Sequence, residues 1–190
     1  MAALLWSAAA RADDFDAYRV ACDDTQSSAA QAAVAEARDK LTSAIDSLPP
    51  VNSAIGAKFQ RWFGGPEGDD DPVIKKVYTE VRGFLTFKSF WCPNKSMPQD
   101  EPGTLAFVPD GSFSEVFLES GFFDLPVAGA NSRGGAILHE VSHQATTASI
   151  VDNAYGTPEC EDMARASPKL ARRNADSLEY FAEDVADGIP

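Results

Sequence analysis

The segment HEVSH, residues 139–143, contains both histidines of this 190-residue chain. Apolar residues recur around it at helical spacing: Ile137, Leu138, Val141 and Ala145. On a helix, residues four apart project from one face, so His139 and His143 can bind a single metal ion. Glu140, one position further round, can reach a water molecule on that ion. The chain must therefore place this helix beside a space that is open to water.

Two histidines do not complete a catalytic zinc site, which usually takes three protein ligands and leaves the fourth position to water. No third histidine exists, so the remaining ligand is a carboxylate or a cysteine, with Asp152, Glu159 and Cys160 as the nearest downstream candidates. Asp152 lies nine residues beyond His143 and opens the run DNAYG. Tyr155 in that run can direct its hydroxyl into the site as a donor to a developing oxyanion.

The HExxH segment followed by DxxYG resembles the signature of the aspzincin metalloendopeptidases, the family of deuterolysin and the fungal peptidyl-Lys endopeptidases. Three more segments are similar to the peptidyl-Lys branch: RWFGG at 61–65, FWC at 90–92 and NADSLEYFAED at 174–184. The resemblance covers about residues 20–185. It implies a zincin-like α+β fold, mostly helical, with a small β-hairpin or sheet and an HExxH active-site helix.

The resemblance also implies a set of roles. One catalytic zinc ion is expected on His139, His143 and Asp152, with Glu140 as the general base toward the zinc-bound water. Tyr155 is expected to stabilise the oxyanion, after which Glu140 returns a proton to the leaving amine. The alternatives are a structural zinc ion, which has no use for the glutamate, and a tyrosine that only packs.

Two departures from the family pattern stand out. Ala148 and Ser149 replace the Gly-Thr pair that usually precedes the aspartate, which changes the loop but removes no ligand. Asn94 and Glu119 stand where the branch tends to carry a second disulfide, so the strand region is expected to be less rigid.

Asp176 and Glu179 lie three residues apart in the last predicted helix, so their carboxylates share a face. In the peptidyl-Lys branch, carboxylates at the matching positions line the pocket for a lysine ammonium group. The resemblance therefore implies that both residues bind substrate and that lysine-containing polypeptides are cleaved before the lysine. The alternative is a solvated helix face. Asn174 is expected to cap the helix or support the site.

Charge and hydropathy limit the remaining possibilities. Sixteen basic and 29 acidic residues give a net charge of −13, which disfavours nucleic-acid and anionic-membrane partners. Residues 1–12 resemble the end of a signal peptide without its basic region, and an ordinary helix is the alternative. We expect residues 13–190 to form a single secreted, monomeric metallopeptidase domain. The rival interpretation is a secreted zinc-containing binding module or toxin fragment without general proteolytic activity.

Three cysteines allow at most one internal disulfide. In an oxidising compartment we predict Cys22–Cys92, because Cys92 follows an aromatic cluster that belongs in the core. Closing that loop stabilises the fold by about 4 kcal/mol. Cys160 then remains a thiol and is expected to be a small buried apolar residue. Asn94 opens a glycosylation sequon, which is weak evidence alone.

Apolar periodicity predicts further helices at residues 25–48, 72–92, 160–166 and 168–185. The second of these carries one apolar stripe: Val73, Val77, Val81 and Leu85. The aromatic segment KFQRWFGG, residues 58–65, separates the first two helices. Two short β-prone runs around a Pro-Asp-Gly turn, at 105–108 and 114–118, predict a hairpin.

Overall fold

The computed structural model describes residues 15–16, 18–50, 52–65, 70–93, 104–109 and 111–189. Its α-helices are α1 (Asp24–Asp46), α2 (Ser53–Phe63), α3 (Asp70–Phe84), α4 (Arg133–Ser142), α5 (Thr157–Ala166), α6 (Pro168–Ala171) and α7 (Ala175–Asp187). Its strands are β1 (Ser89–Trp91), β2 (Ala106–Phe107) and β3 (Glu115–Leu118). None of these helices has the length and apolar character needed to cross a membrane. The expected mostly helical α+β fold with a small sheet is confirmed.

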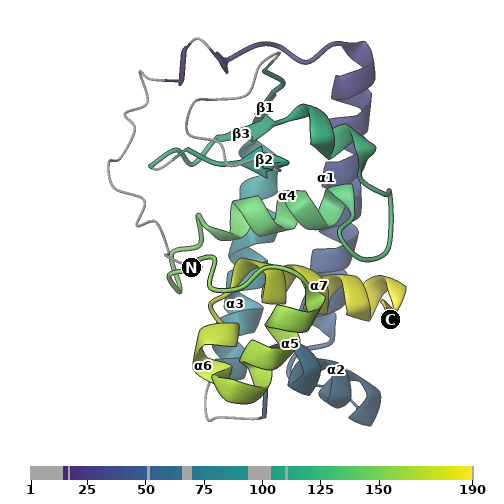
Figure 1. Cartoon of the computed structure of the whole chain (residues 1–190), viewed down its shortest axis with the longest axis vertical. Coiled ribbons are helices and arrows are strands. Elements are labelled where there is room, and N and C mark those ends of the chain that lie inside the picture. Colours follow the sequence, from purple (N-terminus) through teal and green to yellow (C-terminus); the bar gives the residue numbers. More distant parts are fainter. Residues whose placement is uncertain are drawn as a thin grey trace.

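The helix that carries the HEVSH segment, α4, lies between the sheet and α7 (Figure 1). It packs against α1 and α7 and touches β2. Ile137, Leu138 and Val141 are fully buried and join the core that these helices share. Burial of this apolar face fixes how α4 is rotated about its axis, so the direction of the histidines is fixed as well.

The sheet has the strand order β1-β3-β2. The predicted hairpin is present as the antiparallel pair of β2 and β3, with Phe107 opposite Phe117. β1 was not predicted, and it pairs parallel to β3 with Phe90 opposite Val116. Within the described residues β2 is an edge strand, because only one of its sides is paired.

The predicted helices differ from the structure in three ways. The aromatic segment belongs to a helix, α2, because Asn52 caps it through the Ile55 N–H and Phe59, Trp62 and Phe63 form its buried face. The helix from residue 72 ends at Phe84 rather than near residue 92, and a short 3-10 turn leads into β1. The last predicted helix is divided into α6 and α7.

Single positions in these patterns also differ from expectation. Val73 was placed on the buried stripe of its helix, yet it is 37% exposed, and Ile74 and Tyr78 are buried there instead. Ala145 lies beyond the end of α4, which stops at Ser142. Val73 is in a helix but on a more exposed face than predicted, and Ala145 lies just past the helix end; the exact face and end depend on neighbouring elements.

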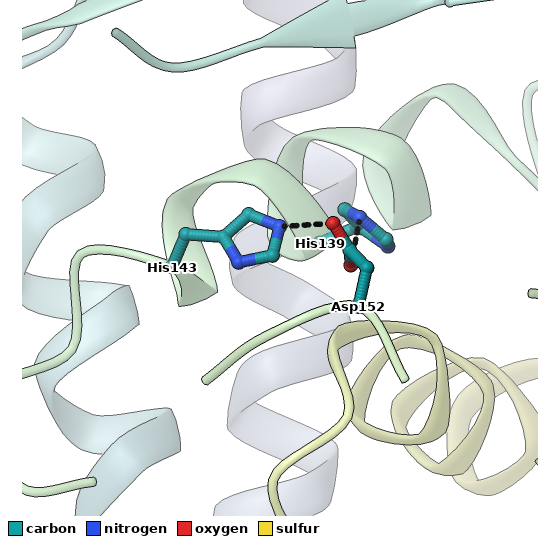
Figure 2. Close-up of side chains that lie close together, drawn as sticks. All are labelled: His139, His143 and Asp152. Atoms are coloured by element: carbon teal, nitrogen blue, oxygen red, sulfur yellow. Dashed lines mark ion pairs between the residues drawn. The ribbon is translucent and has the colours of Figure 1, made fainter. Parts of the chain in front are cut away.

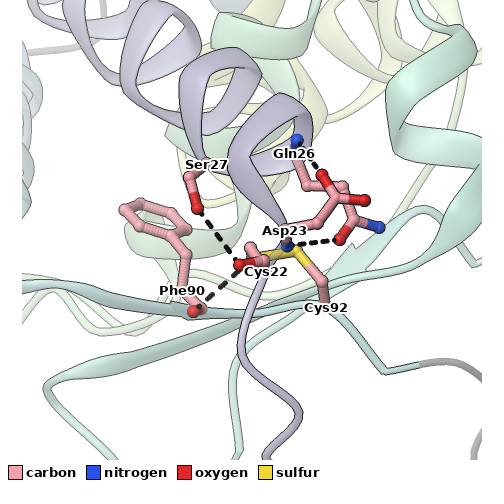
Figure 3. The surroundings of a disulfide bond; sticks show 6 residues. All are labelled: Cys22, Asp23, Gln26, Ser27, Phe90 and Cys92. Carbon is pink, nitrogen blue, oxygen red and sulfur yellow. Dashed lines mark hydrogen bonds between the residues drawn. A yellow bond between two sulfur atoms is a disulfide. The ribbon is translucent and has the colours of Figure 1, made fainter.

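The predicted disulfide is present: Cys22 and Cys92 are joined with an S–S distance of 2.04 Å (Figure 3). Cys22 directly precedes Asp23, whose carboxylate caps α1 by accepting a hydrogen bond from the Gln26 N–H at 2.8 Å. The bridge therefore links the start of α1 to the end of β1. Asn94 and residues 1–12 lie outside the described residues, whereas Glu119 is buried.

Candidate active site

Three side chains from α4 and the segment after it converge at one point (Figure 2). The Nε2 atom of His139 lies 3.2 Å from Oδ1 of Asp152, and Nε2 of His143 lies 3.4 Å from Oδ2 of the same carboxylate. One ligand atom from each residue lies within 4.8 Å of the other two. Of the three candidates for a third ligand, Asp152 is therefore the one that meets both histidines.

The hydrogen bonds behind the two imidazoles show which nitrogen is free. Nδ1 of His139 lies 2.7 Å from a carboxylate oxygen of Asp176, and Nδ1 of His143 lies 3.1 Å from the carbonyl oxygen of Ile150. Because both partners are acceptors, each Nδ1 donates its hydrogen to them, and each Nε2 is left on the side of Asp152, where it can bind a metal ion. Two imidazole nitrogens and a carboxylate oxygen are a donor set that fits a catalytic zinc ion.

The electrostatics of this point favour positive charge. Burial lowers the pKa of His139, but hydrogen bonds with Asp152, Asp176 and Glu179 outweigh it and hold the pKa well above its usual value. Burial raises the pKa of Asp152, yet the hydrogen bond with His139 and the nearby His143 lower it overall. The carboxylates that favour a proton on His139 also favour a metal cation at the same point.

Glu140 directly follows His139 in the sequence, and it lines the same cavity. Burial raises the pKa of its carboxyl to about 8, against the opposing charge of His139 and a backbone hydrogen bond from Val108 after β2. Such a carboxyl can both accept and release a proton near neutral pH.

The ring of Tyr155 stacks on His139, with 6.3 Å between ring centroids, and its hydroxyl interacts with the Asp152 carboxylate. The side chain remains 62% exposed, so packing is a minor part of its environment. Desolvation and the Asp152 charge raise the pKa of Tyr155. The hydroxyl therefore keeps its proton and remains a hydrogen-bond donor.

The segment that carries Asp152 is held against the start of α7. Val151 bridges to Asn174, and the side-chain oxygen of Asn174 accepts hydrogen bonds from the N–H groups of Asn153 and Ala154 at 2.8 and 2.9 Å. Its amide nitrogen donates to the Ala154 carbonyl oxygen at 3.0 Å. Asn174 makes no side-chain cap bond, so of its two expected roles the structure favours support of the site.

Asp176 and Glu179 lie side by side on α7, and both are buried, with exposed fractions of 6% and 5%. They are not part of a solvated helix face. Both line the cavity, and both contact Nδ1 of His139, Asp176 at 2.7 Å and Glu179 at 3.5 Å. Asp176 also accepts a hydrogen bond, at 2.7 Å, from the N–H of Gly156, the residue that follows Tyr155 in the sequence.

Cys160 is a buried free thiol, as predicted. It lies beneath the loop that carries Asp152, where its sulfur contacts the Ala154 carbonyl oxygen at 3.8 Å and the Asn174 amide at 3.4 Å. Burial raises its pKa to about 12, so the thiolate needed for a nucleophile does not form near neutral pH.

Sequence reasoning missed the residues that hold the start of α4. Glu183 on α7 accepts hydrogen bonds from the N–H groups of Asn131 and Ser132 and from the Ser132 hydroxyl. Glu36 on α1 accepts one from the Gly134 N–H at 3.0 Å. Ser132, which caps the helix through the Gly135 N–H, was the only local signal for this arrangement.

The site opens into a cavity of about 1070 Å³. One wall is the segment around β2, and the other contains the cluster of His139, His143 and Asp152 (called below the zinc-binding cluster for its proposed role), together with Tyr155 and the two acidic residues of α7. A cavity of this size beside an edge strand can hold several residues of an extended peptide.

Comparison with known proteins agrees with this geometry. The aspzincin family model, described as a lysine-specific metallo-endopeptidase, matches residues 51–183. The chain is 32% identical over 167 residues to the peptidyl-Lys metalloendopeptidase of Pleurotus ostreatus, which covers 87% of this chain and 95% of that protein. It is 30% identical over 167 residues to the extracellular protease of Aeromonas hydrophila, which covers 86% of this chain and 46% of that protein.

The fold matches a solved structure as well. The zinc peptidase from Grifola frondosa superimposes with a TM-score of 0.75 at 28% sequence identity, over 86% of this chain and 97% of that one. With the family model matching most of the chain, these similarities show that it belongs to the aspzincin family of zinc metalloendopeptidases.

Proposed function

We propose that this aspzincin is a secreted endopeptidase that cleaves polypeptides on the amino side of lysine, with one catalytic zinc ion held by His139, His143 and Asp152. The observation that carries the proposal is the convergence of the two Nε2 atoms on one Asp152 carboxylate, at 3.2 and 3.4 Å. The cluster faces a cavity, as a catalytic site must and a closed structural site does not.

Zinc supplies Lewis acidity that polarises the scissile carbonyl and lowers the pKa of a water molecule. Glu140 takes a proton from the attacking water and passes it to the leaving amine. Glu140 lines the cavity directly after His139, so its carboxyl can hold the proton between these two steps. Tyr155 donates its hydroxyl hydrogen to the oxyanion, a contribution of about 3 kcal/mol in comparable sites.

A peptide substrate is supported by the edge strand. Both residues of β2 line the cavity, and β2 is an edge strand among the described residues, so an extended peptide could pair with it through backbone hydrogen bonds. That pairing places the scissile bond between β2 and the zinc-binding cluster, where Glu140 contacts Val108.

The lysine preference rests on the acidic wall. Asp176 and Glu179 present two buried carboxylates to the cavity beside His139, where a compact ammonium group can contact both. The relatives from Pleurotus ostreatus and Grifola frondosa are named peptidyl-Lys metalloendopeptidases. Secretion is supported by the disulfide and by the name of the Aeromonas relative, an extracellular protease.

The test is digestion of an unfolded protein by the zinc-loaded enzyme, followed by mapping of the new amino termini. We expect termini that begin with lysine, and no cleavage by a Glu140→Gln variant that still binds one equivalent of zinc. Termini that begin with apolar residues would overturn the lysine assignment but leave the metal site intact. Full activity of the Glu140→Gln variant would overturn the mechanism.

A second measurement isolates the acidic wall. Peptides that differ only in lysine or methionine after the scissile bond are compared with the native protein and with Glu179→Gln. Because Glu179 also contacts His139, its loss can slow both peptides. The ratio of their kcat/KM values removes that common effect, and we expect it to fall at least tenfold.

A further inference from the structure

The cavity extends to both sides of the zinc-binding cluster, and its two ends differ. One end is acidic and is tied to His139 through Asp176 and Glu179. The other end lies beside His143 and is lined by Ser112, Phe113, Gln144, Ala145 and Thr146. The volume of about 1070 Å³ is far larger than one lysine side chain needs, so the second end has space for other parts of a substrate.

The second end is built around an exposed aromatic ring. Phe113, in the turn before β3, lines the cavity and is 59% exposed. Cavities that bind ligands are lined largely by apolar and aromatic side chains, so a ring in this position can contact an apolar group of a bound substrate.

The backbone that presents this ring is held firmly. The Gln144 amide nitrogen donates to the Ser112 carbonyl oxygen at 2.6 Å, and Nζ of Lys88 donates to the Phe113 carbonyl oxygen at 2.5 Å. Lys88 also donates to the side-chain oxygen of Gln144. Because Gln144 directly follows His143, these bonds fix the position of the ring relative to the zinc-binding cluster.

We propose that Phe113 forms a binding subsite for an apolar or aromatic side chain of the substrate, two or three residues before the scissile bond. This inference rests on the proposed function, which places the lysine after the scissile bond at the acidic end. The residues before that bond then continue past His143 toward Phe113.

Distances along the chain agree with this direction. His139 and His143 are separated by one helical turn, a rise of about 6 Å. An extended peptide advances about 3.3 Å per residue, so two residues carry it from the acidic end past the second histidine.

Val151, which is 43% exposed, also lines the cavity and adds to its apolar surface.

The experiment uses the zinc-loaded full chain and peptides with a fixed lysine after the scissile bond. The residue two or three positions before that bond is varied between leucine or phenylalanine and serine. We expect the native protein to prefer the apolar peptides, and Phe113→Ala to reduce the kcat/KM ratio of apolar to serine peptides about tenfold.

Phe87→Ala is the matched control, because Phe87 is also an exposed aromatic residue, at 73%, but does not line the cavity. Its variant is expected to keep the native ratio. An unchanged ratio in Phe113→Ala, or an equal loss in Phe87→Ala, would overturn the subsite. So would a Phe113→Ala protein that differs from the native one only in self-association.

The lysine requirement is measured in the same variants. If Phe113→Ala loses the apolar preference but still cleaves before lysine, both proposals stand. If lysine is not required by the native protein, the proposed function fails whatever Phe113 does, so the two failures are distinguishable.

Discussion

The start of α4 and the loop just beyond its end are each held by a glutamate from another helix, and these two glutamates differ in burial. At the start of α4, Glu183 is fully buried and accepts hydrogen bonds from Asn131 and Ser132. Beyond its end, Glu80 on α3 lies nearer to solvent and accepts hydrogen bonds from both the N–H and the hydroxyl groups of Thr146 and Thr147.

Burial gives these glutamates opposite electrostatics. Desolvation, together with the neighbouring Glu179, raises the pKa of Glu183 to about 8. At Glu80 desolvation also raises the pKa, but the four hydrogen bonds from Thr146 and Thr147 together outweigh it and lower the pKa. The start of α4, which carries His139, is thus held by a buried glutamate with a raised pKa, whereas the end of α4 is held by a partly exposed glutamate that attaches the loop leading to Asp152.

The largest effect is expected from adding one methyl group at the start of α4. A Cβ atom at Gly135 would lie 2.2 Å from a Glu183 oxygen and 2.6 Å from a Glu179 oxygen. Gly135→Ala must displace both carboxylates, and we expect it to destabilise the protein by about 3 kcal/mol in chemical denaturation.

Gly83→Ala in α3 is the control, because a Cβ there meets nothing within 4 Å. Alanine is favoured over glycine inside a helix, so this variant should gain up to about 1 kcal/mol. Equal stability of the two variants would show that the carboxylates move away from Gly135 without cost.

The second effect concerns the loop that carries Asp152. Asn174→Ala removes three hydrogen bonds to Asn153 and Ala154, and we expect a loss of about 2 kcal/mol in stability. Zinc affinity should fall about 10- to 100-fold, because the third ligand loses its orientation. Competition with a chelator measures this change.

Asn174→Asp separates the two halves of the contact. Aspartate keeps the acceptor for the two N–H groups but loses the donor to the Ala154 carbonyl oxygen, so its zinc affinity should lie between those of the native protein and Asn174→Ala. An affinity equal to native in Asn174→Ala would show that the backbone bridge at Val151 is sufficient.

The convergence of His139, His143 and Asp152 could be anticipated from sequence because most of its signal is local. His139 and His143 are four apart on one helix, and the spacing alone places their side chains together. The two strands of the hairpin were likewise found from two short β-prone runs on either side of a Pro-Asp-Gly turn. Cys22–Cys92 followed from the expectation that Cys92 is beside the core.

The residues that support the start of α4 could not be predicted, because they come from distant parts of the chain. Glu36 and Glu183 are 98 and 51 residues from their partners Gly134 and Ser132. Nothing local distinguishes them from other acidic residues on amphipathic helices. β1 was missed for a similar reason, since its pairing with β3 gives it strand geometry that its three residues do not encode.

The third prediction concerns Glu183 and the dependence of the protein's stability on pH. The folded-state pKa of Glu183 is raised above that of the unfolded chain, so the folded protein binds more protons and its stability falls as pH rises toward about 8. Glu183→Gln cannot ionise, and we expect its stability to decline less between pH 5 and pH 8, values set by the usual glutamate pKa of 4.5 and the raised one. Denaturation across this range measures the two slopes. Parallel curves would exclude Glu183 as the source of the decline.

The smallest effect is expected at the other end. The folded-state pKa of Glu80 is lowered, so its contribution is present above the usual pKa of 4.5 and is lost as pH falls through the folded-state value. Glu80→Gln keeps one acceptor for the Thr146 and Thr147 N–H groups, so it should cost about 1 kcal/mol at pH 7 and less at pH 3. The pH dependence is thus opposite in sign to that at Glu183. If Glu80→Gln instead lost more stability at pH 3 than at pH 7, the charge on Glu80 would not be what attaches this loop to α3.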